Sequence, residues 1–97
     1  GAEIYAAASG TVVYAGYNGG YGNYIKVDHG DGVGTGYAHI RDGGYHVRYG
    51  QRVDAGTLIG REGSTGTAFG CNLHFEVYLN EAPVDPAAFL SARGVAL

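Results

Sequence analysis

Hydrophobic and polar residues alternate over short stretches of this chain, and glycine-rich turns separate the stretches. Residues 23–28 alternate most clearly, residues 29–32 carry the turn sequence His-Gly-Asp-Gly, and residues 33–39 return as a partner strand. This alternation predicts β-strands with one buried face, because side chains at i and i+2 of a strand point to the same side. Residues 41–44 read as a loop. Further strands are expected at residues 3–6, 11–16, 52–53, 58–60 and 73–79.

The only helical pattern lies near the C-terminal end of the sequence. Asp85 is suited to the N-cap, Pro86 to the first helical position and Gly94 to the residue beyond the helix. Elsewhere, glycine-bounded short strands recur at close spacing, as in all-β domains. We therefore predict a compact, two-sheet antiparallel sandwich with one short C-terminal helix at residues 86–92.

Length and charge narrow the class of protein. The 97 residues are expected to form one domain, 1–97, which buries roughly 60–65% of its unfolded surface. No apolar run reaches the roughly 18 residues that a membrane span needs, and no signal-peptide pattern is seen, so any targeting signal lies outside this sequence. The net charge is -3 and the six Lys and Arg residues are scattered, which argues against a nucleic-acid partner.

Two features of the composition leave alternatives open. The nine tyrosines fit either aromatic pairs across strands or a groove that binds sugars or peptides. Cys71 is the single cysteine, and it is either a small buried apolar residue or the partner of a cysteine upstream of Gly1.

Candidate chemistry gathers on two of the expected strands. In the run GCNLHFEV at residues 70–77, Asn72 and His74 share one face, while Leu73 and Phe75 point to the other side, toward a core. His39 closes the strand that reads Gly-Tyr-Ala-His at residues 36–39. A lone strand histidine is more often structural, but the two motifs together indicate a site.

These motifs resemble those of the lysostaphin-type (LytM-type) zinc metallopeptidases, which cut peptide links in bacterial peptidoglycan. The resemblance runs through the whole chain and implies the compact, barrel-sandwich-like β fold of that family. It implies that His39, in a Tyr-x-His motif, lines the cleft and polarises substrate or water. Position 72 corresponds to the first histidine of a His-x-His strand, which acts on the catalytic water, and His74 corresponds to a zinc ligand. His29 fits the family pattern as a hairpin-turn residue.

The chain departs from the family pattern at two points. Asn72 replaces the catalytic histidine with an amide, which cannot carry a proton near pH 7, and such acid–base assistance is worth about 10²–10⁴-fold in rate. The family takes two further zinc ligands from a His-x-x-x-Asp motif, which this sequence does not contain. Since catalytic zinc takes three protein ligands, we expect zinc to be absent or weakly bound, with His74 as the only matching ligand.

Three hypotheses follow. The favoured one is a degenerate, non-catalytic domain that binds stem or cross-bridge peptides of peptidoglycan, or serves a regulatory or structural role, outside the cell, in the wall or periplasm, or on a phage particle. Asn72 favours it, because a missing upstream segment cannot explain a substitution within the motif. The alternative is an active zinc endopeptidase whose first His and Asp ligands lie upstream of this chain. A biotinyl or lipoyl carrier is disfavoured, because Lys26, the only lysine, lies mid-strand instead of at a hairpin tip.

One further residue of the motif strand has two open roles. Glu76 shares the face of His74, and it is either a partner that orients His74 or a solvated strand carboxylate. His46 matches no motif and is expected to be solvated.

Overall fold

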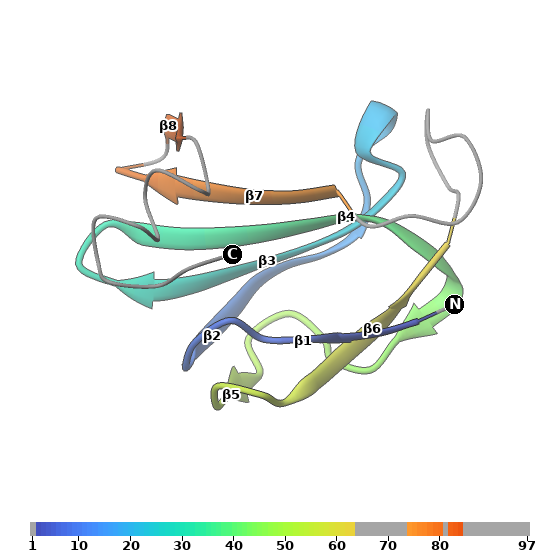
Figure 1. The fold of residues 1–97 in the computed structure, drawn as a ribbon, viewed down its shortest axis with the longest axis horizontal. Coiled ribbons are helices and arrows are strands. Elements are labelled where there is room, and N and C mark those ends of the chain that lie inside the picture. Colours follow the sequence, from blue (N-terminus) through green and yellow to red (C-terminus); the bar gives the residue numbers. More distant parts are fainter. Residues whose placement is uncertain (1, 64–73, 81, 85–97) are drawn as a thin grey trace.

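The computed structural model describes residues 2–63, 74–80 and 82–84, and strands dominate this part of the chain (Figure 1). The expected all-β fold is confirmed, whereas the helix expected at residues 86–92 lies outside the described residues. The strands are β1 (Glu3–Tyr5), β2 (Gly10–Tyr17), β3 (Asn23–Gly30), β4 (Val33–Tyr45), β5 (Arg52–Val53), β6 (Leu58–Glu62), β7 (His74–Leu79) and β8 (Ala82–Val84). A 3-10 turn, η1 (Gly19–Tyr21), joins β2 to β3.

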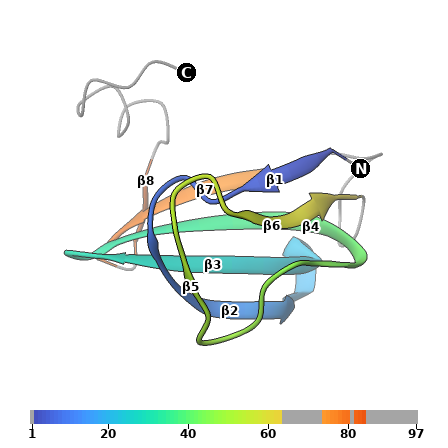
Figure 2. The same ribbon diagram turned by 90° about the horizontal axis from the view of Figure 1, so that it is seen from below.

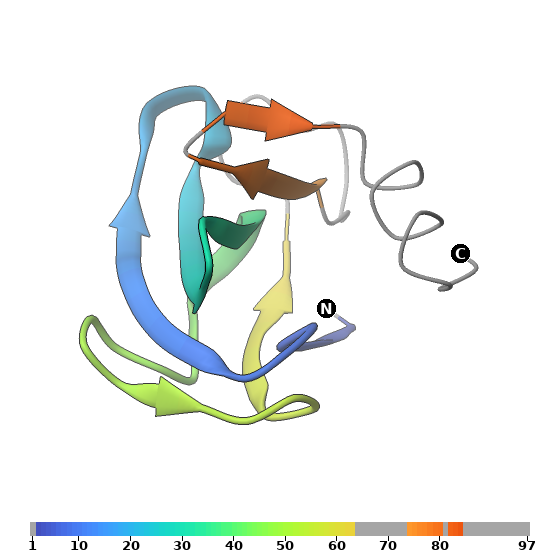
Figure 3. The same ribbon diagram turned by 90° about the vertical axis from the view of Figure 1, so that its left-hand side faces the viewer.

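The strands form one antiparallel sheet that curls on itself, as Figures 2 and 3 show from two further directions. The long strand β4 pairs with β7 from Val33 to Ala38, and then with β6 at Ile40 and Tyr45. It therefore passes from one layer of the fold to the other. The two layers that the sequence predicts are present, and β4 joins them.

The expected loop at residues 41–44 is wrong, because β4 continues through it to Tyr45. Gly43 has a φ of 70° and allows the strand to bend there. Gly44 lies close to its neighbours, since a Cβ at that position would fall 2.9 Å from the Arg41 carbonyl oxygen. The glycine pair that suggested a loop instead permits a bent strand.

The core lies between the two layers and follows from the alternation along the strands. Ile25 and Val27 of β3 are fully buried and belong to one core cluster with Ile40 of β4 and Ile59 of β6. The register is firmly set, because a slip of one residue would turn this buried face of β3 toward solvent.

A chain of hydrogen bonds runs from the β3–β4 hairpin into this core. The His29 ring contacts the Ser9 carbonyl oxygen through Nδ1 (2.8 Å) and the Thr35 hydroxyl through Nε2 (2.7 Å). Thr35 bonds the Tyr37 hydroxyl at 2.8 Å, and that hydroxyl accepts the Ala7 backbone N–H at 3.0 Å. His29 thus has structural partners, which fits its expected place in the hairpin.

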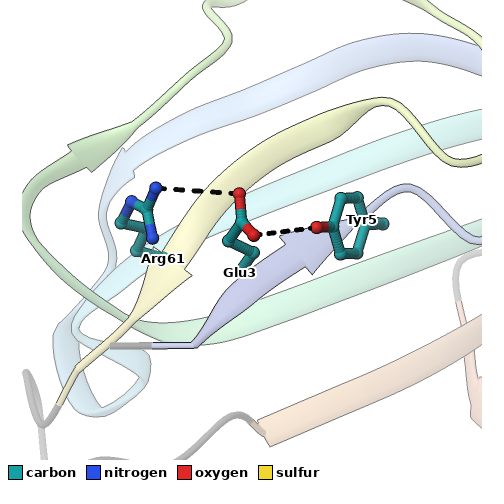
Figure 4. A network of polar contacts seen from close by, with 3 residues as sticks. All are labelled: Glu3, Tyr5 and Arg61. Atoms are coloured by element: carbon teal, nitrogen blue, oxygen red, sulfur yellow. Dashed lines mark hydrogen bonds and ion pairs between the residues drawn. The ribbon is translucent and has the colours of Figure 1, made fainter.

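Polar contacts on the surface accompany the pairing of β1 with β6 (Figure 4). Glu3 pairs with Arg61, whose guanidinium lies 3.7 Å from its carboxylate, and Tyr5 donates a hydrogen bond to the same carboxylate at 3.0 Å. This hydrogen bond raises the pKa of Tyr5. These side chains are exposed, so the pairing of the backbones contributes more than the charges do.

Candidate functional site

His39 lies at an irregularity in β4. Tyr37 of β4 pairs with Ile25 of β3, and Ile40 of β4 pairs with Asn23 of β3. Between these two pairs, β4 has two residues where β3 has one. The extra residue makes a β-bulge, and His39 within it has a φ of 60°, in the left-handed region that histidine seldom adopts. Such strain is found at functional sites, where the surrounding structure holds it in place.

Both neighbouring strands hold the backbone around His39. The His39 carbonyl oxygen accepts the Gly63 N–H at 2.9 Å, on the side of β6. On the side of β3, the buried Asn23 amide donates to the Ile40 carbonyl oxygen at 3.1 Å and to the Asp42 carboxylate at 2.7 Å. The backbone of the bulge is therefore held by hydrogen bonds on two sides. The His39 residue is half-buried.

The structure brings His39 and His74 to neighbouring positions on adjacent strands. The first residue of β7, His74, pairs with Ala38, the residue before His39. Asn72 and Cys71 lie outside the described residues, as does the side chain of His74. The convergence of the side chains of His39, Asn72 and His74 stays a prediction, and the backbone pairing is consistent with it.

Tyrosine hydroxyls surround Glu76 on the face of the sheet opposite the core. Tyr78 donates to one oxygen of the Glu76 carboxylate at 2.5 Å, and Tyr21 donates to the other at 3.3 Å. Tyr24 donates in turn to the Tyr78 hydroxyl at 2.9 Å. Burial and the adjacent Glu76 carboxylate both raise the pKa of Tyr78. Glu76 is thus a partner of tyrosines, which neither of its two expected roles included.

The same tyrosines form an aromatic cluster. The Tyr21 ring stacks on Tyr24 with centroids 4.8 Å apart, and the Tyr14 ring meets Tyr24 edge-on at 5.7 Å. The Lys26 ammonium lies 4.3 Å from the centre of the Tyr78 ring. Two sequence signals pointed toward this cluster. The nine tyrosines suggested aromatic pairs across strands or a groove, and the alternation in β3 and β7 placed Tyr24 with Lys26 and Glu76 with Tyr78 on single faces.

A pocket of about 600 Å³ opens beside this cluster, toward the β3–β4 hairpin. Tyr14, Tyr24 and Tyr78 line it together with Lys26, and residues 28 and 30–34 close the end at the hairpin. His39 is not among its described lining residues. The tyrosine-lined pocket and the bulge at His39 therefore occupy different positions along β4.

The described residues do not supply a metal site. Within residues 2–63, 74–80 and 82–84, no group of three or more His, Cys, Asp or Glu residues could hold a metal ion. Lys26 lies within β3, away from the hairpin tip, which is not where a carrier domain attaches its cofactor. No helix in the described part of the chain is long and apolar enough to cross a membrane.

Comparison with known proteins finds a family model and several relatives that this chain resembles. The family model described as peptidase family M23 matches residues 1–86. The DD-carboxypeptidase/endopeptidase Mpg of Neisseria meningitidis is 39% identical over 88 residues, which are 91% of this chain and 20% of Mpg. The murein hydrolase activator NlpD of Salmonella typhimurium is 43% identical over 94 residues, 96% of this chain and 24% of NlpD. The chain thus spans about a quarter or less of these two relatives.

Solved structures show the same fold. The catalytic domain of lysostaphin from Staphylococcus simulans superposes with a TM-score of 0.84 at 36% identity, over 94% of this chain and 71% of that one. A zinc-containing peptidase from Vibrio cholerae superposes with a TM-score of 0.82 at 35% identity, over 88% of this chain and 26% of that one.

Proposed function

Because the chain belongs to peptidase family M23, we propose that it is a peptidoglycan-directed domain that binds wall peptides without cleaving them. The observation that carries the proposal is Asn72, two positions before His74 in the motif strand. An asparagine can donate a hydrogen bond to a developing oxyanion, but it cannot take a proton from water and return it. The position retains a polar group for binding and lacks the acid–base group for hydrolysis.

The metal chemistry of the family concerns hydrolysis and not peptide binding. Zinc, when bound in this family, supplies a water made nucleophilic near neutral pH. This requires three protein ligands, of which this sequence matches one, His74, so hydrolysis would need ligands from outside it. Peptide binding as proposed depends only on residues of this chain that contact the peptide.

Two kinds of relative support a binding or regulatory role in the cell envelope. NlpD, at 43% identity, is described as a murein hydrolase activator. The Lipoprotein NlpD/LppB homolog of Pseudomonas aeruginosa is 42% identical over 94 residues. By this analogy the domain would act outside the cytoplasm, at the wall or in the periplasm.

The second candidate function is peptide-bond hydrolysis by a zinc site completed from outside this sequence. The similarity to Mpg, a DD-carboxypeptidase/endopeptidase, and the retention of His39 and His74 favour it. In that case the whole protein would cleave peptidoglycan slowly, because Asn72 would still lack the proton-transfer role.

Co-sedimentation with purified peptidoglycan and release of dye from labelled walls separate the two candidates when the whole protein is compared with the 97-residue chain. We expect both to sediment with walls and to release no dye, with or without added zinc. Asn72→His in the 97-residue chain should behave in the same way, because one restored histidine does not complete the metal site. Zinc-dependent release of dye by the whole protein would contradict the proposal and favour hydrolysis. A failure to sediment with walls would contradict peptide binding.

A further inference from the structure

The bulge at His39 changes which residues of β4 face the core. Tyr37 and Ile40 lie three positions apart in the sequence, and both belong to the buried core cluster. In a regular strand, residues three apart point to opposite sides of the sheet, because successive side chains alternate. The extra residue of the bulge allows both of these side chains to point inward.

The same bulge sets the side of the sheet on which His39 lies. In an unbroken strand, His39 would share the side of Tyr37 and enter the core. Because it immediately precedes the inward-facing Ile40, His39 lies toward the outer face instead, and it is half-buried there. That face carries Glu76 of β7 and its tyrosine partners. The bulge thus keeps an imidazole out of the core and presents it beside the motif strand.

Asn23 lies next to the bulge and carries a buried side-chain amide. It pairs with Ile40 from β3 and is 7% exposed. Its amide nitrogen donates to the Ile40 carbonyl oxygen at 3.1 Å and to the Asp42 carboxylate at 2.7 Å. Since a carbonyl and a carboxylate only accept hydrogen bonds, both contacts require the NH₂ group of the amide, whose two hydrogens serve one acceptor each.

The residue type at position 23 follows from this need for two donor hydrogens on a short side chain. Serine or threonine offers one such hydrogen, and an ionised aspartate of the same shape offers none. The two acceptors belong to Ile40 and Asp42, the first and third residues after His39. The buried amide therefore fixes β4 where the strand leaves the bulge.

We propose that Asn23 is a positioning residue, which acts on a wall peptide through His39 by fixing the bulge that turns His39 to the outer face. Asn23 itself stays buried and does not contact the peptide. A φ of 60° is strained for histidine and persists only where the surrounding structure holds it, so loss of the amide lets the His39 backbone relax. The inference rests on the proposed function and adds the residue that positions one of its contacts.

Co-sedimentation with purified peptidoglycan over a range of wall concentrations tests the effect on binding. Asn23→Ala and His39→Ala should each weaken binding about tenfold, the ratio that loss of one hydrogen bond to a ligand gives. The double variant should bind no more weakly than His39→Ala, because Asn23 acts only through His39. Asp42→Ala is the matched control, since Asn23 still donates to the Ile40 carbonyl oxygen, and it should bind as the unaltered chain does.

The backbone conformation of His39 provides a readout that does not depend on binding. NMR chemical shifts of Cα and Cβ distinguish a left-handed residue from an extended one. We expect left-handed shifts for His39 in the unaltered chain and in Asp42→Ala, and extended shifts in Asn23→Ala. A merely structural loss of stability would lower the unfolding midpoint without moving these shifts.

An exchange variant replaces Asn23→Ala if that variant does not fold. Asn23→Asp with Asp42→Asn keeps a hydrogen bond between the two side chains and removes the donor to the Ile40 carbonyl oxygen. It should weaken binding and move the His39 shifts as Asn23→Ala does. Loss of folding in both variants would overturn the inference, because Asn23 would then serve the whole fold.

The remaining outcomes separate the inference from the proposed function. Unchanged His39 shifts in the Asn23 variants would overturn the inference, whether or not the chain binds walls. Equal binding by His39→Ala and the unaltered chain, or further weakening in the double variant, would overturn it while leaving the proposed function standing. Failure of the unaltered chain to bind walls would contradict the proposed function and the effect on a peptide, while the shifts still decide whether Asn23 positions His39.

Discussion

The Tyr24 ring lies where a side chain on residue 36 would be. A Cβ built on Gly36 would fall 2.9 Å from the Tyr24 Cζ and would be closer still to the Tyr24 hydroxyl oxygen. Gly36 is therefore the reason that Tyr24 can cross β4 and reach the Tyr78 hydroxyl. One glycine on β4 permits a contact between β3 and β7.

Gly36→Ala should destabilise the protein by about 1–3 kcal/mol, because the methyl group displaces a buried ring and breaks the Tyr24–Tyr78 hydrogen bond. Urea unfolding measures the change. Gly16→Ala is the matched control: Gly16 pairs with Tyr24 from β2, and a Cβ there meets nothing nearer than 3.9 Å. We expect Gly16→Ala to change stability by less than about 0.5 kcal/mol. Equal effects of the two substitutions would contradict the proposed crowding at Gly36.

Thr35→Val should cost about 1–3 kcal/mol, because it keeps the shape of the side chain and leaves His29 and the buried Tyr37 hydroxyl each without one partner. Thr11→Val is the control, since its hydroxyl makes only a 3.5 Å exposed contact with Arg52. If thermal or urea unfolding gave the same loss for both variants, the hydrogen-bond chain would not stabilise the core.

His39→Gly should stabilise the fold by about 0.5–1 kcal/mol, because glycine adopts a φ of 60° without the steric cost that a Cβ brings. The same substitution should weaken peptide binding if His39 contacts the ligand. His46→Gly is the control, because His46 is exposed and has no positive φ. A clear loss of stability in His39→Gly would mean that side-chain contacts of His39 outweigh the backbone strain.

The stability of the protein should fall as the pH rises above about 10. Burial raises the pKa of Tyr37 and of Tyr78, so the folded state holds these phenol protons at a pH where the unfolded chain has released them. The stabilisation is complete below the unfolded pKa of about 10 and declines above it. Urea unfolding between pH 8 and pH 11 measures the slope, and Tyr78→Phe should reduce it. An unchanged slope in this variant would contradict the role of Tyr78.

The sequence by itself determined the strands and the family. Alternation placed most strands because one buried face imposes a period of two residues, and the two histidine motifs indicated His39 and His74 as neighbours. The sequence did not determine that β4 continues through residues 40–45, because the glycines that suggest a loop also allow a strand to bend. The sequence also did not determine the bulge at His39. The bulge arises because β4 has one residue more than β3 between two paired positions, and this register is set by the folded sheet.

Only the tertiary structure decided what the tyrosines do. Alternation assigns a side chain to a face, but it does not say which strand lies beside it. Tyr24 and Glu76 meet through Tyr78 because β3, β4 and β7 are neighbours in that order and Gly36 lies between them. That order is set by long-range pairing and burial of the core, so the pocket follows from the folded sheet and not from any local pattern.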